Sequence, residues 1–500
     1  MLNFCQSGRD QEVLITGTGV VCPLGIGLQA AWQRLLNGHS ACRSLAADEL
    51  HRGKELHRVP GLRLHGAPVD GLRIRQLSQH LPSLQRLSSD MRSVVHAEPV
   101  LAMTAVALEE ALLQAGLRVP LANPTRTAVL FGGSKGGLAT TELLLNSQRQ
   151  QALPEALNAA QRTDRNEQLQ VACAGYGLAE SQAVANGWPT RATSAEVPAA
   201  TCSAPPDLLA AADSTCLSDA AFATAFGKAF TTDGAARLIM ELLKAGGPGL
   251  CPVAACATGL ISVLQGAAMI HAGLCDVCIT GSADAALRTS ILASFHRLQV
   301  LSRHPEAATA CRPFDATRDG FVIGDGAAVL ILESRRHARR RGATPLAQVL
   351  GGGWLSDPTG ITQMDESGTT VAELLSRCCD SVGATPDVLS LHGTGTETND
   401  LVEARGIVRS LGNRLPVCFA TKGASGHLLG AAGSVETALL TAAMTAAFQP
   451  GTKNLTQPDP RCPIPLSPRG TPLPPNTTWG KLSLGFGGHA ACGFFRAATR

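Results

Sequence analysis

Short apolar segments alternate along the chain with longer segments in which apolar residues recur at helical spacing. Apolar runs bounded by Gly, Pro or Asp are typical of buried strands, and apolar residues three and four positions apart are typical of helices. This pattern predicts strands at 12–21, 127–131, 276–281, 327–333, 346–350, 388–392, 417–421, 481–485 and 491–495, and helices at 28–36, 101–115, 371–382 and 435–448. Alternating strands and helices indicate an α/β fold. Because the two halves share this outline, we expect a duplicated α/β unit.

A long segment without any charged residue lies between Lys244 and Asp276. Its first part predicts a buried strand at 250–255, and the apolar spacing after it predicts a helix at 257–272. Cys256 falls in the turn between the two. A thiol at a helix N-terminus lies near free backbone N–H groups and the positive end of the helix dipole, which favour the thiolate. Cys256 is therefore a candidate nucleophile.

Three other interpretations of this segment stay open. Cys256 can be an ordinary core residue, because free cysteines often pack as small hydrophobes. The segment has the length of a membrane span, although glycines and prolines interrupt it. The spacing of Cys251, Cys256, Cys275 and Cys278 superficially imitates a zinc site, although the pair Cys275-x-x-Cys278 also fits a strand. We expect neither a membrane span nor a metal.

Two histidines follow predicted strands and lie among glycines. His392 opens the segment HGTGT, and His427 closes the segment TKGASGH. Glycines let a ligand approach the backbone, so two such turns indicate a site. Lys422 lies shortly before His427, and Glu436 in the next predicted helix is a partner that a buried lysine would need. A thiolate, two imidazoles and a lysine suit acyl transfer at a thioester carbonyl.

Composition excludes several classes of function. The formal net charge is +3 with no long charged tail, which argues against a general nucleic-acid-binding protein. Sixteen scattered cysteines and an N-terminus without an apolar leader predict a cytoplasmic location. The basic run at 335–341 predicts a solvated face. The segment GGSKG at 132–136 weakly matches the G-x-S-x-G of serine hydrolases, with Ser134 as the nucleophile.

Several segments together resemble one family. They are VLITGTGVVCPLG near the N-terminus, AACATG around Cys256, CRPFDATRDGFVIGDGAAVLILE at 311–333, HGTGTETND from His392, TKGASGHLLGAAGSVE from Thr421 and SLGFGGHAACGF from Ser483. In this order they closely resemble the elongating beta-ketoacyl-acyl-carrier-protein synthases of the thiolase superfamily. The resemblance covers most of the chain except about residues 140–235. It implies a thiolase-like duplicated five-layer αβαβα architecture.

The resemblance implies a role for each candidate residue. Cys256 would take an acyl group from a phosphopantetheine thioester, and His392 and His427 would bind the malonyl thioester carbonyl and stabilise the enolate formed on decarboxylation. Lys422, paired with Glu436, would support the histidines. The backbone N–H groups of Cys256 and Phe486 would form the oxyanion hole, and Phe486 would also gate the pocket. Thr394, Thr396 and Gly487 would bind the substrate.

The resemblance also sets expectations for the whole molecule. The synthase half that carries the nucleophile would span 1–340, with an insertion at about 140–235, and the half that carries the His/Lys cluster would span 341–500. We expect a homodimer that acts with an acyl-carrier protein, with no bound cofactor other than the phosphopantetheine that carries the substrate. His489 and Ala490 stand where the family often has Thr-Asn. The alternatives are a non-catalytic partner subunit of chain-length-factor type and a serine or cysteine acyl hydrolase.

Overall fold

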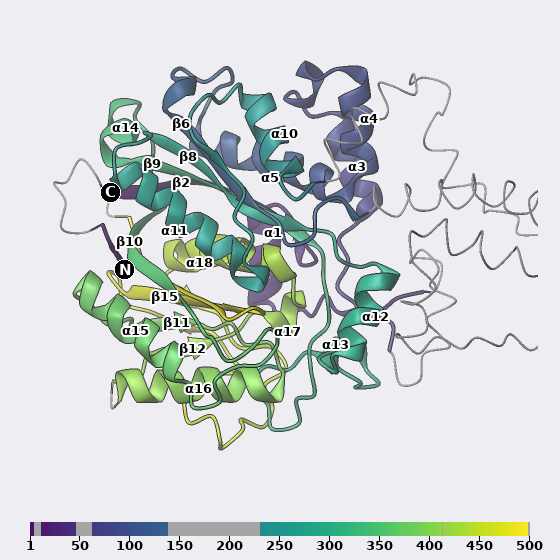
Figure 1. The fold of residues 1–500 in the computed structure, drawn as a ribbon, viewed down its shortest axis with the longest axis vertical. Helices are drawn as coiled ribbons and strands as arrows, with labels where there is room; N and C mark the ends of the chain where they lie inside the picture. The colour runs from purple at the N-terminus through teal and green to yellow at the C-terminus, as the bar shows by residue number, and fades with distance from the viewer. Residues whose placement is uncertain (5–11, 47–62, 139–230, 413, 499–500) are drawn as a thin grey trace, which may run out of the picture. The chain divides into compact units, whose positions relative to one another are not determined.

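The computed structural model describes residues 1–4, 12–46, 63–138, 231–412 and 414–498. These residues belong to one compact unit, formed within Met1–Leu138 and Asp219–Arg500, and are drawn in colour in Figure 1. The predicted insertion at about 140–235 lies outside the described residues except for its last five positions. That part of the predicted organisation stays a prediction.

The main strands form two sets with the same arrangement. The first set is β2 (Val13–Cys22), β6 (Thr127–Gly132), β7 (Gly249–Leu250), β8 (Val277–Asp284) and β9 (Gly326–Ser334), and the second is β10 (Ala347–Ser356), β11 (Val388–Ser390), β12 (Val417–Phe419), β15 (Thr478–Gly485) and β16 (His489–Ala497). Their spatial orders are β2-β9-β8-β6-β7 and β10-β16-β15-β11-β12.

The directions of the strands repeat as well. In each set the first strand pairs antiparallel with the last, and the last pairs antiparallel with the one before it. The two remaining pairs are parallel. The sets are joined because β10 pairs with β2 over Ala347–Val349. The prediction of a duplicated α/β unit is therefore confirmed.

Helices complete five layers. α5 (Pro99–Ala115) and α10 (Gly234–Leu243) cover the outer face of the first strand set, and α15 (Thr369–Val382) covers that of the second, with α16 (Glu397–Leu411) beside it. Between the sets lie α11 (Thr258–His271) and α18 (Ala432–Ala446), which pack on each other and on strands of both sets (Figure 1). Both central helices are apolar on nearly every side, as expected for buried helices. The αβαβα architecture is confirmed.

Shorter elements connect these layers. The short strands are β1 (Leu2–Asn3), β3 (Gly25–Ile26), β4 (Arg43–Ser44), β5 (His65–Gly66), β13 (Phe448–Gln449) and β14 (Thr471–Pro472). The other helices are α1 (Leu28–Leu36), α3 (Gly71–Gln79), α4 (Ser89–Ala97), α12 (Thr289–Arg297), α13 (Ala307–Ala310), α14 (Arg335–Arg340) and α17 (Lys422–Ser425). The 3₁₀ turns of the described residues are η3 (Leu84–Arg86), η4 (Pro124–Arg126), η5 (Ala255–Ala257) and η6 (Leu429–Ala431).

The predicted buried strand at 250–255 is wrong. The strand β7 contains only Gly249 and Leu250, and the Leu250 side chain is 49% exposed. Pro252 has no N–H to donate to a neighbouring strand, and the N–H of Ala254 donates instead to Oγ1 of Thr258 at 2.8 Å. The charge-free segment therefore stays near the surface until Ala254, where it enters the core.

The basic run at 335–341 is only partly a solvated face. Its helix α14 exposes most of its arginines, but Arg341 and His337 both pair with the buried carboxylate of Glu333. Burial opposes ionisation of this carboxylate, but its hydrogen bonds from Arg341 and His337 prevail and lower the pKa of Glu333 to about 2. None of the described helices combines the length and apolar character that crossing a membrane requires.

Candidate active site

Cys256 lies in a tight turn directly before the central helix α11. Ala255 before it has a φ of +46°, and Thr258 fixes the turn because its hydroxyl also donates to the carbonyl of Ala255 at 2.7 Å. The thiol is buried and belongs to an apolar cluster with Phe321 and Leu429. The prediction that Cys256 lies in a turn at the N-terminus of a helix is confirmed.

The end of β15 lies against this turn. A Cβ placed on Gly485 would be only 3.0 Å from the backbone nitrogen of Cys256, so glycine is required for this close approach. No hydrogen bond within the described residues uses the N–H of Cys256 or of Phe486, which follows Gly485. Both N–H groups are therefore without an acceptor among the described residues.

The two predicted histidines lie together. His392 follows β11, and His427 follows the one-turn helix α17 rather than a strand. Their ring centroids are 5.3 Å apart with the planes at 81°, and the ring of Phe321 lies edge-on to His427 at 5.0 Å. Because Phe321 also belongs to the apolar cluster around Cys256, the histidines and the thiol border the same region.

A buried cluster of charges supports the histidines. The ammonium of Lys422 lies 2.7 Å from Oε1 of Glu436 and 3.4 Å from Nδ1 of His392. The ammonium of Lys481 lies 2.8 Å from the other oxygen of Glu436. The sequence predicts a strand at this position but does not indicate that Lys481 belongs to the site. All three charged side chains are at most 3% exposed. Glu436 on α18 therefore joins two lysines from the second strand set and its connections.

Burial and positive charge keep both imidazoles neutral. Burial, followed by the charge of Lys422, holds the pKa of His392 and of His427 well below the usual range. For Glu436, burial acts in the opposite direction, but Lys422 and Lys481 lower its pKa. A lysine ammonium directed at Nδ1 of His392 assigns the remaining proton to Nε2. A neutral imidazole with one N–H can donate to a carbonyl oxygen or an enolate.

Burial also affects the nucleophile. It raises the pKa of Cys256 to about 11, and the charges of Lys135 and Lys422 only partly oppose this effect. The sequence-based expectation of a stabilised thiolate at the helix N-terminus is therefore not met in the free protein. The thiol is the predominant form at neutral pH.

A buried carboxylate that the sequence did not reveal, that of Glu403, stabilises the turn at His392. Glu403 on α16 accepts from the N–H of His392 at 2.6 Å and from that of Gly393 at 2.8 Å. Burial raises the pKa of Glu403 to about 7, although these hydrogen bonds lower it. Glu403 lies just after the segment HGTGTETND. It is seven residues, or two helical turns, from Thr396, and this spacing could have identified it as a residue on the same helix face.

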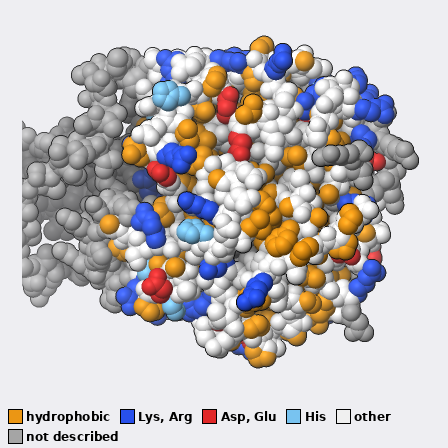
Figure 2. All heavy atoms as spheres, turned by 180° about the vertical axis from the view of Figure 1, so that it is seen from behind, with side chains coloured by type: hydrophobic (Ala, Val, Ile, Leu, Met, Phe, Trp, Pro, Cys, Tyr) orange, Lys and Arg blue, Asp and Glu red, His pale blue; other side chains and the backbone are white. Residues whose placement is uncertain are grey.

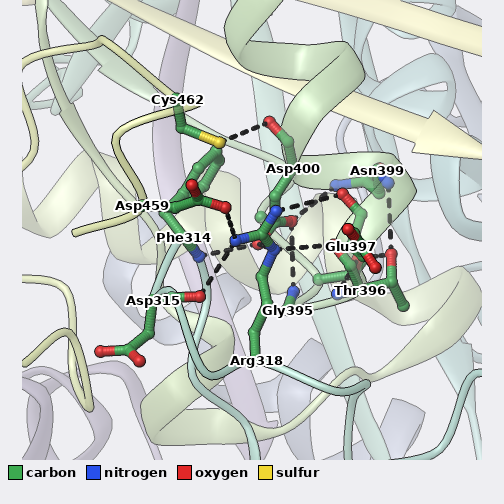
Figure 3. A network of polar contacts seen from close by, with 12 residues as sticks. Phe314, Asp315, Arg318, Gly395, Thr396, Glu397, Asn399, Asp400, Asp459 and Cys462 are labelled. Carbon is green, nitrogen blue, oxygen red and sulfur yellow. Dashed lines mark hydrogen bonds and ion pairs between the residues drawn. The ribbon is translucent and has the colours of Figure 1, made fainter. Parts of the chain in front are cut away.

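Thr394 and Thr396 lie side by side. Their hydroxyl oxygens are 2.9 Å apart, and Oγ1 of Thr396 also accepts from the N–H of Asn399 as the N-cap of α16. Arg318 fixes the position of this loop, because its guanidinium donates to the carbonyls of Thr396 and Glu397, each at 3.2 Å (Figure 3).

Arg318 is itself fixed by two acids. It lies 2.6 Å from Asp459 and 3.5 Å from Asp400, and all three side chains are almost completely buried (Figure 3). Asp400 also accepts from the N–H of Gly395 at 3.2 Å. The network therefore determines where the two threonine hydroxyls lie.

Phe486 and Gly487 form the turn between β15 and β16. Phe486 is half-buried and stacks on Phe295 of α12, with ring centroids 6.3 Å apart. Gly487 is exposed, has a φ of +83°, and donates its N–H to the carbonyl of Ile361 at 2.6 Å. His489 and Ala490 are the first residues of β16 and pair with Gly485 and Leu484 of β15.

Comparison with family models assigns both parts of the chain. The model for the beta-ketoacyl synthase N-terminal domain matches residues 10–174 and 157–338, and the model for the beta-ketoacyl synthase C-terminal domain matches residues 346–456. The chain belongs to the beta-ketoacyl synthase family.

Curated relatives agree with this family. A 3-oxoacyl-[acyl-carrier-protein] synthase 2 of Mycobacterium tuberculosis is 35% identical over 246 residues, which cover 48% of this chain and 59% of the relative. The chain thus matches little more than half the length of that relative. A putative polyketide beta-ketoacyl synthase 1 of Streptomyces cyaneus is 28% identical over 467 residues and 92% of each chain.

Solved structures share the fold. One is a type II polyketide acyl-carrier protein in complex with its ketosynthase bound to the hexaketide; it has a TM-score of 0.70 at 22% identity and covers 98% of this chain and 99% of that chain. The ishigamide ketosynthase/chain length factor has the same TM-score at 24% identity, with 98% and 100% coverage. At these identities the similarity concerns the fold.

The geometry does not support the two other interpretations of the sequence, a zinc site and a serine hydrolase. Cys256 and Cys275 lie on either side of α11, about 21 Å long at 1.5 Å per residue, which separates them too far to share an ion. Within the described residues no group of three potential metal ligands occurs. Ser134 bonds to Asp284 and Lys135 rather than to a histidine, so the described residues give it no general base of the hydrolase type.

Proposed function

We propose that this chain is a condensing enzyme that joins an acyl group held on Cys256 to a malonyl group held on an acyl-carrier protein. One observation carries the proposal: a buried thiol borders two neutral imidazoles, and a carboxylate paired with two lysines supports them. This set of groups suits carbon–carbon bond formation at thioesters, which needs a nucleophile, a site for an enolate and no metal.

The first step would load the enzyme. Sγ of Cys256 attacks the carbonyl of an acyl thioester, and the phosphopantetheine thiol leaves with the proton. The developing oxyanion accepts from the N–H groups of Cys256 and Phe486, which have no other acceptor within the described residues. Because the thiol has a raised pKa, its proton must leave as the sulfur–carbon bond forms.

The second step would form the new bond. His392 and His427 donate to the malonyl thioester carbonyl, the carboxylate leaves as CO₂, and the electron pair forms an enolate stabilised by the two N–H donors. The enolate carbon attacks the acyl-cysteine carbonyl, and the Cys256 thiolate leaves and regains a proton. The product is a beta-ketoacyl thioester on the carrier protein. Neutral imidazoles suit this step because each retains an N–H to donate.

The remaining candidates would bind the carrier's arm. Thr394 and Thr396 present adjacent hydroxyls to a phosphopantetheine, Gly487 leaves space for it, and Phe486 gates the acyl site. The carrier-bound phosphopantetheine is the only cofactor that this mechanism uses. On the face shown in Figure 2, Lys and Arg side chains are spread among apolar ones and acidic side chains are sparse, which would suit an acidic carrier protein. Arg86 is exposed, whereas Arg92 is half-buried.

A homodimer is part of the same proposal, on the basis of family membership, and sedimentation analysis of the purified protein tests it. A non-catalytic subunit of chain-length-factor type is the second candidate, because one structural neighbour is a ketosynthase/chain length factor. The retained Cys256, His392, His427 and Lys422 favour catalysis over that role. The pathway would be the synthesis of fatty acids or of related polyketide or polyene lipids.

Intact-mass spectrometry with a panel of acyl-carrier proteins tests the proposal. We expect an acyl mass increase on the wild type and none on Cys256→Ala. Addition of malonyl-carrier protein should remove the acyl group and produce ketoacyl-carrier protein. A folded protein that forms no adduct with any acyl group would contradict independent catalysis and favour the partner-subunit role.

A further inference from the structure

Lys135 has no part in the proposed mechanism, although its ammonium lies 5.8 Å from the ring centroid of Phe295, which packs on the apolar cluster that contains Cys256. It belongs to the loop that follows β6. Gly132 at the start of this loop packs against Thr258 of α11, two residues after Cys256, so closely that a Cβ there would be 2.3 Å from the Thr258 methyl group. Gly430 of η6 packs on Ser134 in the same way. The loop therefore lies between the turn that carries Cys256 and the segment that follows His427.

A buried carboxylate fixes the loop in this position. Asp284, at the end of β8, accepts from the hydroxyl of Ser134 at 2.6 Å, from its N–H at 3.2 Å and from the N–H of Gly430 at 2.6 Å. Its side chain is 2% exposed. These three hydrogen bonds fix the loop at Ser134, and no ion pair joins Asp284 to Lys135.

The ammonium of Lys135 faces the aromatic side chains of the acyl site. It lies 5.8 Å from the ring centroid of Phe295, which stacks on Phe486 and contacts Phe321 at 5.8 Å. It donates to the hydroxyl of Ser134 at 2.6 Å. Among the described residues no carboxylate forms an ion pair with it, although the side chain is half-buried.

The charge of Lys135 reaches the reacting groups. Burial raises the pKa of Cys256, and Lys135 is the first of the charges that lower it. Lys135 also lowers the pKa of His427, after burial and Lys422. An acyl group on Cys256 would therefore lie within the field of a cation that has no paired carboxylate among the described residues.

We propose that Lys135 selects the acyl group that Cys256 carries, favouring chains that bear a keto or carboxylate oxygen over plain alkyl chains. This inference rests on the proposed acyl transfer. An acyl chain that covers the ammonium removes its water, and a hydrocarbon offers no acceptor in return. An oxygen on the chain accepts a charge-assisted hydrogen bond from Lys135, which corresponds to about a tenfold preference or more.

Alkylation of Cys256 tests the effect of the charge without requiring turnover. The rates of carboxymethylation by anionic iodoacetate and of carbamidomethylation by neutral iodoacetamide are measured by peptide mass spectrometry. We expect the ratio of the two rates to fall about tenfold in Lys135→Met, which keeps the length and removes the charge, and to be retained in Lys135→Arg. An unchanged ratio in Lys135→Met would overturn the proposal.

Competition between thioesters tests the preference itself. Wild type and both variants receive equimolar hexanoyl- and 5-oxohexanoyl-pantetheine, and the acyl-enzymes are separated by mass. The wild type and Lys135→Arg should favour the oxo chain about tenfold, and Lys135→Met should lose this preference. Equal loading of the wild type would overturn the selection. Failure of every acyl group to load, with an alkylation ratio that still depends on Lys135, would instead contradict the proposed acyl transfer.

Discussion

At the residue scale, burial and positive charge act in opposite directions on Cys256. The turn places the thiol at a helix N-terminus, where a thiolate is favoured, but the apolar cluster around it raises its pKa to about 11. The charges that oppose this effect come from Lys135 and Lys422, which are distant in sequence. In the free protein the thiol of Cys256 therefore stays mostly protonated at neutral pH.

The pH dependence of alkylation should show this directly. Only the thiolate reacts, and its fraction rises about tenfold per pH unit below the pKa. We expect the rate of Cys256 modification by iodoacetamide to rise without a plateau from pH 7 to pH 9.5, because the pKa is about 11. Peptide mass spectrometry follows the reaction, with Cys256→Ala confirming the assignment. A plateau below pH 8 would show instead that the helix terminus dominates.

Glu436 should be essential for stability. It is the shared partner of Lys422 and Lys481, both fully buried. Glu436→Gln would leave two lysines without a counter-charge, and we expect a loss of about 3–5 kcal/mol in the free energy of unfolding at neutral pH. Urea titration measures it. The control Glu373→Gln, in an exposed pair with Arg377, should lose less than about 0.5 kcal/mol. Equal losses in the two variants would contradict this view of the cluster.

At the scale of elements, the two central helices meet through glycines. A Cβ on Gly259 of α11 would be 2.3 Å from the backbone nitrogen of Ser434 on α18, and one on Gly433 would be 2.5 Å from that of Leu260. These two helices occupy corresponding places in the duplicated unit, and they carry the residues that follow Cys256 and the carboxylate of Glu436. Their close contact sets the distance between the nucleophile and the charge cluster.

Gly259→Ala should therefore affect both stability and loading. We expect a loss of about 1–3 kcal/mol in the free energy of unfolding, because the added methyl group must push α11 from α18, together with slower acylation of Cys256. Urea titration and intact-mass loading kinetics measure the two effects. Gly71→Ala, where no atom lies within 4 Å of the new Cβ, is the matched control and should lower neither stability nor loading. Wild-type stability in Gly259→Ala would refute the close contact.

At the scale of the whole molecule, one apolar core joins the two halves. It contains Trp32 of α1, buried apolar residues of α11 and α18, and Trp479 of β15. Because side chains from both halves form this one core, neither half can unfold without exposing apolar side chains of the other. The described residues form one compact unit for this reason.

Two tryptophans from different halves should report one transition. We expect variants that retain only Trp32 or only Trp479, with the other tryptophans replaced by Phe, to show fluorescence changes that are sigmoidal in urea. Each tryptophan signal should coincide with the circular dichroism transition of its own variant. A tryptophan transition separated from the loss of secondary structure would show that the halves unfold independently.

The sequence by itself determined most elements and indicated the candidate reactive groups. Apolar periodicity identified the core strands and helices because burial imposes it locally, and Cys256, His392, Lys422 and His427 stand in turns rich in small residues that are readable without coordinates. Only the tertiary structure decided which charged side chains lie near these residues. Lys481 in a strand, Glu403 in a helix and Lys135 in a loop act through contacts between segments far apart in the chain. It also decided the raised pKa of Cys256, because desolvation depends on everything packed around the thiol rather than on its neighbours in sequence.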